Sequence, residues 1–212
     1  MSEKYITVSG SAVAEITEKK SRFIANVRPV KTEEEALSFL AEIRKKYSDA
    51  RHNVYAYSVR ENNISRFSDD GEPAQTAGLP IMDLIKKAGL TDLIVVVTRY
   101  FGGILLGTGG LVRAYTKSAK EGIIAASPAE MRLCREIGVE CDYTLLGRIQ
   151  AKVMELGYEI SEPVYSDKVT LFLYVPDSEV SGFMNEMVEI SNGKAEITLG
   201  ETKFQPQKVE IA

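Results

Sequence analysis

A chain of 212 residues with 44% hydrophobic and 26% charged residues has the composition of a globular protein and excludes a disordered one. No apolar run reaches the roughly 20 residues that span a bilayer, and the N-terminus lacks the basic start and apolar stretch of a signal peptide. Without either segment, we expect a cytoplasmic protein. The formal net charge of −4 does not identify a nucleic-acid-binding domain.

Charge is distributed unevenly along the chain. Residues 1–130 carry 18 Lys and Arg against 16 Asp and Glu, whereas residues 131–212 carry 8 against 14. This difference in charge predicts two domains, and the Pro-containing stretch at 128–131 is the predicted boundary between them. We therefore expect an N-terminal domain over residues 1–130 and a C-terminal domain over residues 131–212.

Strands and helices are both expected in the first domain. Thr32 and Glu35 form a capping box, which predicts a helix that runs to about Tyr47. The continuous apolar, β-branched run at 93–98 predicts a strand that is buried on both faces. The other expected elements are strands at 5–8, 12–17, 22–30 and 53–59, and helices at 80–87 and 111–124.

The second domain has a recognisable order of elements. Strands at 133–143, 159–165, 169–175 and 195–199 alternate with helices at 145–156 and 179–190. This βαββαβ order is typical of a ferredoxin-like domain, so the fold class expected for the whole chain is α+β. Cys134 and Cys141 are expected to be small buried hydrophobes, because seven positions along one strand place them on opposite faces.

The segment 97–115 is the most informative part of the sequence. Five glycines lie within nine residues between a predicted buried strand and a predicted helix, with Arg99 before them and Arg113 after them. Glycine lets another group approach the backbone closely, and a helix N-terminus favours phosphate or carboxylate. The segment lacks the Lys-Ser/Thr of a phosphate-binding Walker loop and the acid of a dinucleotide site. Anion binding and tight packing around Ile104–Leu106 both remain open.

A second group of polar residues combines the one histidine of the chain, His52, with the acids Asp69, Asp70 and Glu72. Carboxylates and an imidazole are suited to binding a divalent cation or to acid–base catalysis. The same acids are also ordinary turn residues, and they are equally suited to orienting nearby arginines by ion pairing. Thr76 is expected to cap the helix that follows the acidic loop.

These segments together resemble the YigZ/IMPACT family in order and in spacing. The resemblance covers roughly residues 15–125, and residues from about 135 onward are similar to the C-terminal domain of its bacterial branch. It is carried by Ser21-Arg22-Phe23, Ala50-Arg51-His52-Asn53, Ser68-Asp69-Asp70-Gly71-Glu72-Pro73, Thr76-Ala77-Gly78 with Pro80, and the segment 97–115.

The resemblance implies a first domain of the ribosomal-protein-S-five domain-two-like fold and a ferredoxin-like second domain similar to the last domain of elongation factor G. It implies a link to translational control, because eukaryotic relatives are connected to it through a regulator of the starvation-response kinase. Some bacterial relatives are labelled as peptidases, so the resemblance does not decide between binding and catalysis.

We expect a binding protein that contacts structured RNA or the ribosome, with no cofactor, no metal site and no membrane partner. A regulator that binds a protein partner is the first alternative, and a metal-dependent hydrolase or peptidase that uses His52, Asp69, Asp70 and Glu72 is the second. The residues expected to bind the anion are Arg51, Arg99, Gly102, Gly103, Gly107, Gly109, Gly110 and Arg113.

Overall fold

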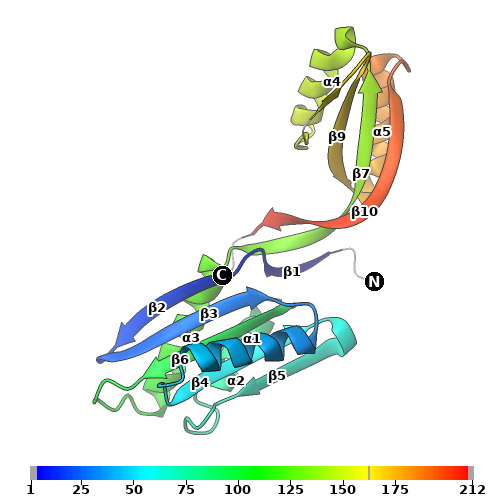
Figure 1. The fold of residues 1–212 in the computed structure, drawn as a ribbon. Coiled ribbons are helices and arrows are strands. Elements are labelled where there is room, and N and C mark those ends of the chain that lie inside the picture. The colour runs from blue at the N-terminus through cyan, green and yellow to red at the C-terminus, as the bar shows by residue number, and fades with distance from the viewer. Residues whose placement is uncertain (1–3, 162, 210–212) are drawn as a thin grey trace. The chain divides into compact units, whose positions relative to one another are not determined.

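The computed structural model of the chain describes residues 4–161 and 163–209. They form two compact units, which Figure 1 colours along the chain. Tyr5–Glu130 and the segment that begins at Pro206 form the N-terminal domain, whereas Met131–Gln205 and Lys4 form the C-terminal domain. Among the described residues, no helix combines the length and hydropathy that crossing a membrane requires.

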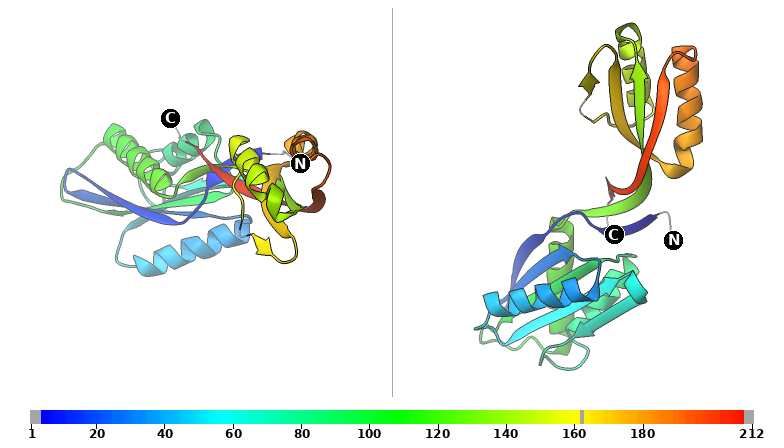
Figure 2. Two further views of the ribbon diagram at one scale, coloured as in Figure 1. Left: turned by 90° about the horizontal axis from the view of Figure 1, so that it is seen from above. Right: turned by 45° about the vertical axis from the view of Figure 1, so that its right-hand side comes forward.

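An antiparallel sheet forms the middle layer of the N-terminal domain, with the strand order β2-β3-β6-β4-β5. Helix α1 packs on one face of this sheet, and helices α2 and α3 pack on the other (Figure 2, left). The elements, after the short β1 (Lys4–Val8), are β2 (Ala12–Glu18), β3 (Ser21–Pro29), α1 (Glu33–Lys46), β4 (His52–Val59), β5 (Ile64–Ser68), α2 (Gly78–Lys87), β6 (Leu93–Tyr100) and α3 (Thr108–Ala125), with a 3₁₀ turn at Glu61–Asn63.

Strand β6 is the centre of this domain, and the prediction of a strand buried on both faces is confirmed. Val95 and Val97 pack into the core beneath α2 and α3, whereas Ile94 and Val96 pack into the core beneath α1. Each of these side chains is fully buried. Such a strand provides a rigid base for the residues at its carboxyl end.

The capping box at the start of α1 is also confirmed. The Glu35 amide donates a hydrogen bond to Thr32 Oγ1 at 3.1 Å, and the Lys31 amide donates to Glu35 Oε2 at 2.7 Å. Two backbone donors that the helix cannot satisfy internally are therefore satisfied by side chains.

Two features of the N-terminal domain differ from the sequence prediction. Strand β5 was not expected, because an edge strand with partly exposed side chains shows no clear apolar alternation. Helix α3 begins at Thr108, three residues before the predicted start at Leu111. Gly109 and Gly110 therefore lie in the first turn of the helix and not in the loop that precedes it.

The C-terminal domain has the predicted βαββαβ order. Its sheet has β9 between β7 and β8, and β10 also pairs with β7. Helices α4 and α5 cover one face through a core that includes Ile137, Leu171 and Phe183. Its elements are β7 (Pro128–Cys141), α4 (Tyr143–Glu155), β8 (Val164–Tyr165), β9 (Val169–Pro176), α5 (Val180–Ser191) and β10 (Glu196–Lys208), with a 3₁₀ turn at Asp177–Glu179.

Details of this domain correct the prediction in two places. The strand expected at 159–165 is reduced to the two residues of β8 and an isolated bridge between Ile160 and Leu173, and Glu162 lies outside the described residues. Strand β10 extends well beyond the expected end at residue 199. Cys134 and Cys141 are free and buried as expected, and burial raises the pKa of both thiols.

Candidate functional site

The carboxyl end of β6 aligns three side chains across the sheet. In the strand register, Arg99 pairs with Phe23 of β3 on one side and with His52 of β4 on the other. Residues that face each other in antiparallel strands point to the same side of a sheet. All three side chains therefore lie on the face covered by α2 and α3, close to the beginning of residues 102–110, which we call the Gly-rich segment.

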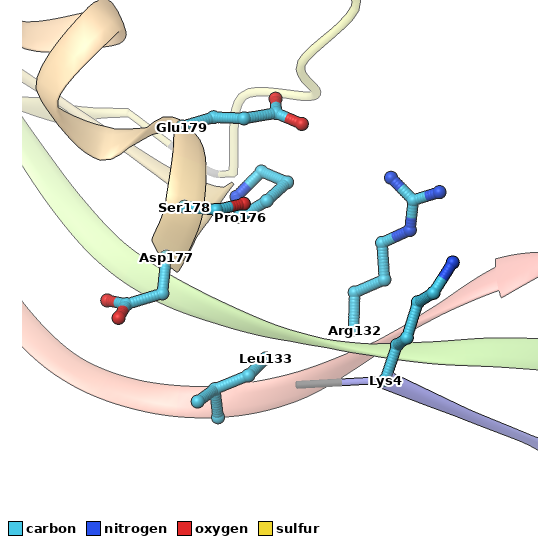
Figure 3. Close-up of a pocket in the computed structure, with 7 residues that line it drawn as sticks. All are labelled: Lys4, Arg132, Leu133, Pro176, Asp177, Ser178 and Glu179. Atoms are coloured by element: carbon cyan, nitrogen blue, oxygen red, sulfur yellow. The ribbon is translucent and has the colours of Figure 1, made fainter. Parts of the chain in front are cut away.

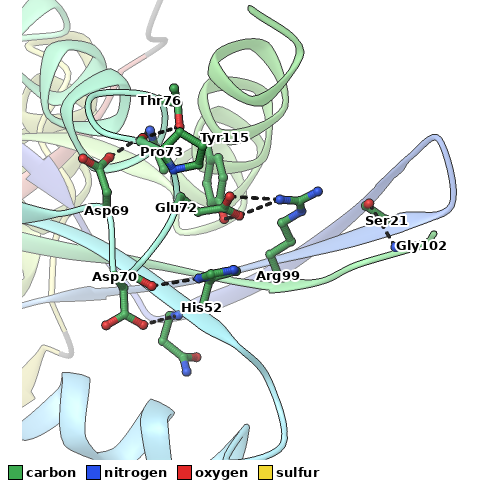
Figure 4. Close-up of polar contacts among 12 residues, drawn as sticks. Ser21, His52, Asp69, Asp70, Glu72, Pro73, Thr76, Arg99, Gly102 and Tyr115 are labelled. Atoms are coloured by element: carbon green, nitrogen blue, oxygen red, sulfur yellow. Dashed lines mark hydrogen bonds and ion pairs between the residues drawn. The ribbon is translucent and has the colours of Figure 1, made fainter. Parts of the chain in front are cut away.

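Arg99 takes part in a buried network with Glu72 and Tyr115 (Figure 4). Arg99 Nη1 donates to both Glu72 carboxylate oxygens, at 2.7 and 3.0 Å, and the Tyr115 hydroxyl donates to Oε1 at 2.7 Å. The Arg99 and Glu72 side chains are 8% and 3% exposed. The sequence left three interpretations of the acidic loop at 68–73. This geometry matches the one in which the loop orients an arginine by ion pairing.

The network holds the Tyr115 phenol in its protonated form. Burial first, and then the Glu72 carboxylate, raise the pKa of Tyr115 far above its ordinary value near 10. A tyrosine in the unfolded chain ionises above pH 10 while folded Tyr115 does not, so this group stabilises the fold fully below pH 10 and loses that contribution as the pH rises.

We expect wild-type protein to lose about 1.4 kcal/mol of unfolding free energy per pH unit above 10 through Tyr115. The Tyr115→Phe variant is expected to decline less steeply over the same range, because the other tyrosines are unchanged in both proteins. Urea unfolding at several alkaline pH values measures both slopes, and parallel slopes would contradict this assignment.

The Asp69 carboxylate is used to start a helix. Its Oδ1 accepts hydrogen bonds from the amides of Ala77 and Gly78 at 3.0 and 2.8 Å, and its Oδ2 accepts one from the Gln75 amide at 2.8 Å. Asp69 thus satisfies the amide of Gly78, the first residue of α2, together with two amides that precede the helix. The prediction that Thr76 caps this helix is wrong, because the Thr76 hydroxyl donates to the Pro73 carbonyl instead.

Asp70 joins the acidic loop to the beginning of β4. Its Oδ2 accepts a hydrogen bond from the Asn53 amide at 2.7 Å, and its Oδ1 pairs with Arg44 Nη2 at 2.8 Å. His52 Nδ1 lies 2.8 Å from the Asp70 carbonyl oxygen. Because a carbonyl only accepts, Nδ1 carries the proton, which leaves Nε2 as the ring atom able to accept.

The four residues considered for catalysis therefore lie in one region, but each has a structural contact. His52 bonds to the acidic loop, Asp69 to the start of α2, Asp70 to β4 and Arg44, and Glu72 to Arg99. In the ranges 4–161 and 163–209, no group of three or more His, Cys, Asp or Glu side chains is positioned to hold a metal ion. A metal-dependent site at these residues has no support from this geometry.

Gly102 lies where the Gly-rich segment contacts the β2–β3 hairpin. A Cβ atom at Gly102 would lie 2.0 Å from the Lys20 carbonyl carbon, so only glycine fits. The Gly102 amide donates to Ser21 Oγ at 3.1 Å, and Figure 4 shows this contact beside Arg99. This contact brings the hairpin turn, Lys19 and Lys20, next to the segment.

Gly103 and Gly107 have positive φ values of 83° and 71°, which glycine adopts without strain. Gly107 precedes α3 and supplies no side-chain cap, and the first turn of α3 holds no acidic residue. The first helical hydrogen bond at this end runs from the Leu111 amide to the Gly107 carbonyl. The amides of Thr108, Gly109 and Gly110 therefore precede the bonded ladder and face outward at the positive end of the helix dipole.

The arginines expected to bind an anion are in different environments. Arg113 is exposed in the first turns of α3, and its Nη1 would lie 3.6 Å from a Cβ placed at Gly109. Arg51 is exposed just before β4. Arg99, in contrast, is buried and paired with Glu72, so its guanidinium is not part of the surface.

Sequence reasoning did not predict that two cations, Lys19 and Lys20, lie in a turn that contacts the Gly-rich segment. Both are exposed, and their φ values of 43° and 67° are those of a tight two-residue hairpin turn between β2 and β3. The signal was present as a polar pair between two strands, but only the contact with Gly102 places it beside the Gly-rich segment.

The C-terminal domain has a pocket of about 470 Å³ (Figure 3). Lys4 and Arg132 line one part of it, and Asp177 and Glu179 line another. Its lining combines charges of both signs, and none of its residues belongs to the motifs that the sequence analysis identified. We therefore place the candidate site in the N-terminal domain.

Two family models match separate parts of the chain. Residues 19–123 match the model of the Impact N-terminal domain, and residues 139–194 match a domain of unknown function (DUF1949). A solved crystal structure of a hypothetical protein, 30% identical, superposes with a TM-score of 0.59 and covers 95% of this chain and 98% of its own.

Three relatives show how far the similarity extends. IMPACT family member YvyE of Bacillus subtilis is 42% identical over 99% of this chain and 97% of its own length. IMPACT family member YigZ of Escherichia coli is 34% identical over 84% of this chain and 89% of its own. Protein IMPACT of Mus musculus is 38% identical over 43% of this chain and 30% of its own. The chain belongs to the IMPACT family, because it matches the Impact N-terminal domain and is similar over nearly its whole length to a protein of that family.

Proposed function

We propose that the protein is a binding protein that contacts structured RNA, including that of the ribosome. The start of α3 binds phosphate groups of the RNA, and the protein acts in translational regulation. The observation that carries the proposal is the uncapped N-terminus of α3 beside the exposed Arg113. Free amides at the positive end of a long helix, together with a guanidinium, suit a phosphate.

Charge around this surface supports the same proposal. No Asp or Glu occurs between Asp92 and Glu121, whereas Arg113, Lys117 and Lys120 all lie in α3. Lys20 and Arg113 have no ion-pair partner within the described part of the chain. Cations that are not neutralised by neighbouring carboxylates are the ones that displace counterions from a phosphate backbone.

A protein partner is the second candidate, and it rests on a different observation. Ile104 and Leu105 are 42% and 83% exposed at the tip of the Gly-rich segment. Exposed apolar side chains of this size commonly mark a contact surface. Recovery of one stoichiometric protein without RNA in a pull-down would favour this candidate over RNA binding.

Co-sedimentation with purified ribosomes at low and at near-physiological salt tests the proposal. Wild-type protein is expected to sediment, more strongly at low salt, and Lys20→Gln/Arg113→Gln is expected to lose most of this binding. Lys45→Gln/Lys46→Gln on α1, across the sheet from α3, removes the same charge and is the matched control. Equal sedimentation of the two double variants, or none of the wild-type protein, would refute the contact.

A further inference from the structure

Phe101 is the aromatic side chain at the point where β6 leads into the Gly-rich segment. Its side chain is 53% exposed, although it directly follows a strand whose preceding residues are buried. Exposure of a large aromatic ring costs free energy because apolar surface remains in water. The ring is therefore available to a ligand at this surface.

The buried side of Phe101 contacts a fixed cation. Arg99 Cζ lies 5.7 Å from the centre of the Phe101 ring and 5.5 Å from the centre of the Phe23 ring. Glu72 holds this guanidinium through two hydrogen bonds, so it cannot move away from the rings. A guanidinium within about 6 Å of a ring is attracted to its π system. Phe101 therefore has a rigid support on one side and solvent on the other.

Arg99 has one further unusual feature. Its Nε is buried and has no hydrogen-bond partner in the described part of the chain. An unsatisfied buried donor costs free energy, so this atom does not stabilise the fold. The contacts that the same guanidinium does make are the ion pair with Glu72 and the approach to the rings of Phe23 and Phe101.

Candidate phosphate-binding groups lie on the two segments that adjoin Phe101, one by contact with Gly102 and one along the chain. Gly102, the residue after Phe101, packs against the backbone of Lys20 in the hairpin turn, and the uncapped start of α3, with Arg113 beyond it, lies further along the chain. An aromatic ring among cations is the arrangement with which proteins bind unpaired nucleotides, because every base has a π face that stacks on the ring. A base inside a duplex is already stacked and cannot reach it.

We propose that Phe101 is a stacking platform for an unpaired base, so that the site takes single-stranded nucleotides such as an RNA loop or bulge and not a continuous duplex. This inference rests on the proposed function, and it specifies which form of RNA the site accepts. The ring supplies the contact to the base, and Lys20, Arg113 and the α3 amides supply the contacts to its phosphates.

The chain contains no tryptophan, so Phe101→Trp introduces a single fluorescent reporter into the full-length protein. The probes are an oligoadenylate of about twelve nucleotides, within the usual site size, and an RNA duplex of equal length. We expect the reporter to be quenched by the single strand only. We also expect Phe101→Leu, which keeps an apolar side chain but loses the ring, to weaken single-strand binding about tenfold without changing duplex binding.

The outcomes separate this inference from the proposed function. Equal affinity of wild-type protein for the two probes, with no effect of Phe101→Leu on either, would overturn the stacking platform and leave phosphate binding intact. Binding of neither probe would overturn both. A thermal unfolding curve of Phe101→Leu that matches wild type excludes misfolding as the cause of a loss.

Discussion

Replacing Glu72 by alanine is expected to lower the free energy of unfolding by about 3–5 kcal/mol, because the change leaves the Arg99 guanidinium buried without a countercharge. The Tyr115 hydroxyl loses its acceptor at the same time. Charges that are more than nine-tenths buried are poorly screened by water, so the loss is far larger than for an ion pair at the surface. Chemical denaturation monitored by circular dichroism measures it.

An exposed ion pair of the same domain provides the control. Arg28 and Glu42 are paired at 2.9 Å, but their side chains are 39% and 55% exposed, so Glu42→Ala is expected to cost no more than about 1 kcal/mol. The double variant Glu72→Leu/Arg99→Met is expected to recover much of the lost stability, because it removes both buried charges. A loss below 1 kcal/mol for Glu72→Ala would show that the buried pair does not hold this site together.

The Gly102→Ala variant is the second change with a large expected effect. The new methyl group would lie 2.0 Å from the Lys20 carbonyl carbon and 2.4 Å from the Ser21 nitrogen. Both are backbone atoms, so the hairpin must shift, and overpacking of this kind costs about 3 kcal/mol or more. The hydrogen bond from the Gly102 amide to Ser21 Oγ is expected to break with it.

A second glycine shows whether space is the cause. Nothing lies within 4 Å of a Cβ built at Gly10, so Gly10→Ala is expected to change the free energy of unfolding by less than about 0.5 kcal/mol. Equal stability of the two alanine variants would mean that the hairpin and the Gly-rich segment are not in contact.

Much of the fold was predictable because the local sequence signals and the burial of the same residues in the structure indicate the same elements. The capping box at Thr32 and the apolar run at β6 identify a helix and a central strand without reference to the rest of the chain. The βαββαβ order of the C-terminal domain follows from periodicity in the same way. Strand β5 could not be predicted, since it depends on pairing with β4 and not on its own pattern.

The candidate site was predictable in its composition but not in the role of each residue. The sequence shows that Asp69, Glu72 and Arg99 are near glycines, but only the folded geometry assigns Asp69 to α2 and Glu72 to Arg99. Side chains brought together by a register or by a hairpin contact, such as Lys20 beside Gly102, have no signal in the local pattern.

The salt dependence of RNA affinity tests most directly whether phosphate is bound at the start of α3. Fluorescence anisotropy of a labelled single-stranded RNA, titrated at several salt concentrations, gives the slope of log affinity against log salt for wild-type protein and for Lys20→Gln/Arg113→Gln. Loss of two phosphate contacts is expected to make the slope shallower by about 1.4, at roughly 0.7 for each contact. The same slope and the same affinity in both proteins would contradict phosphate binding at this site.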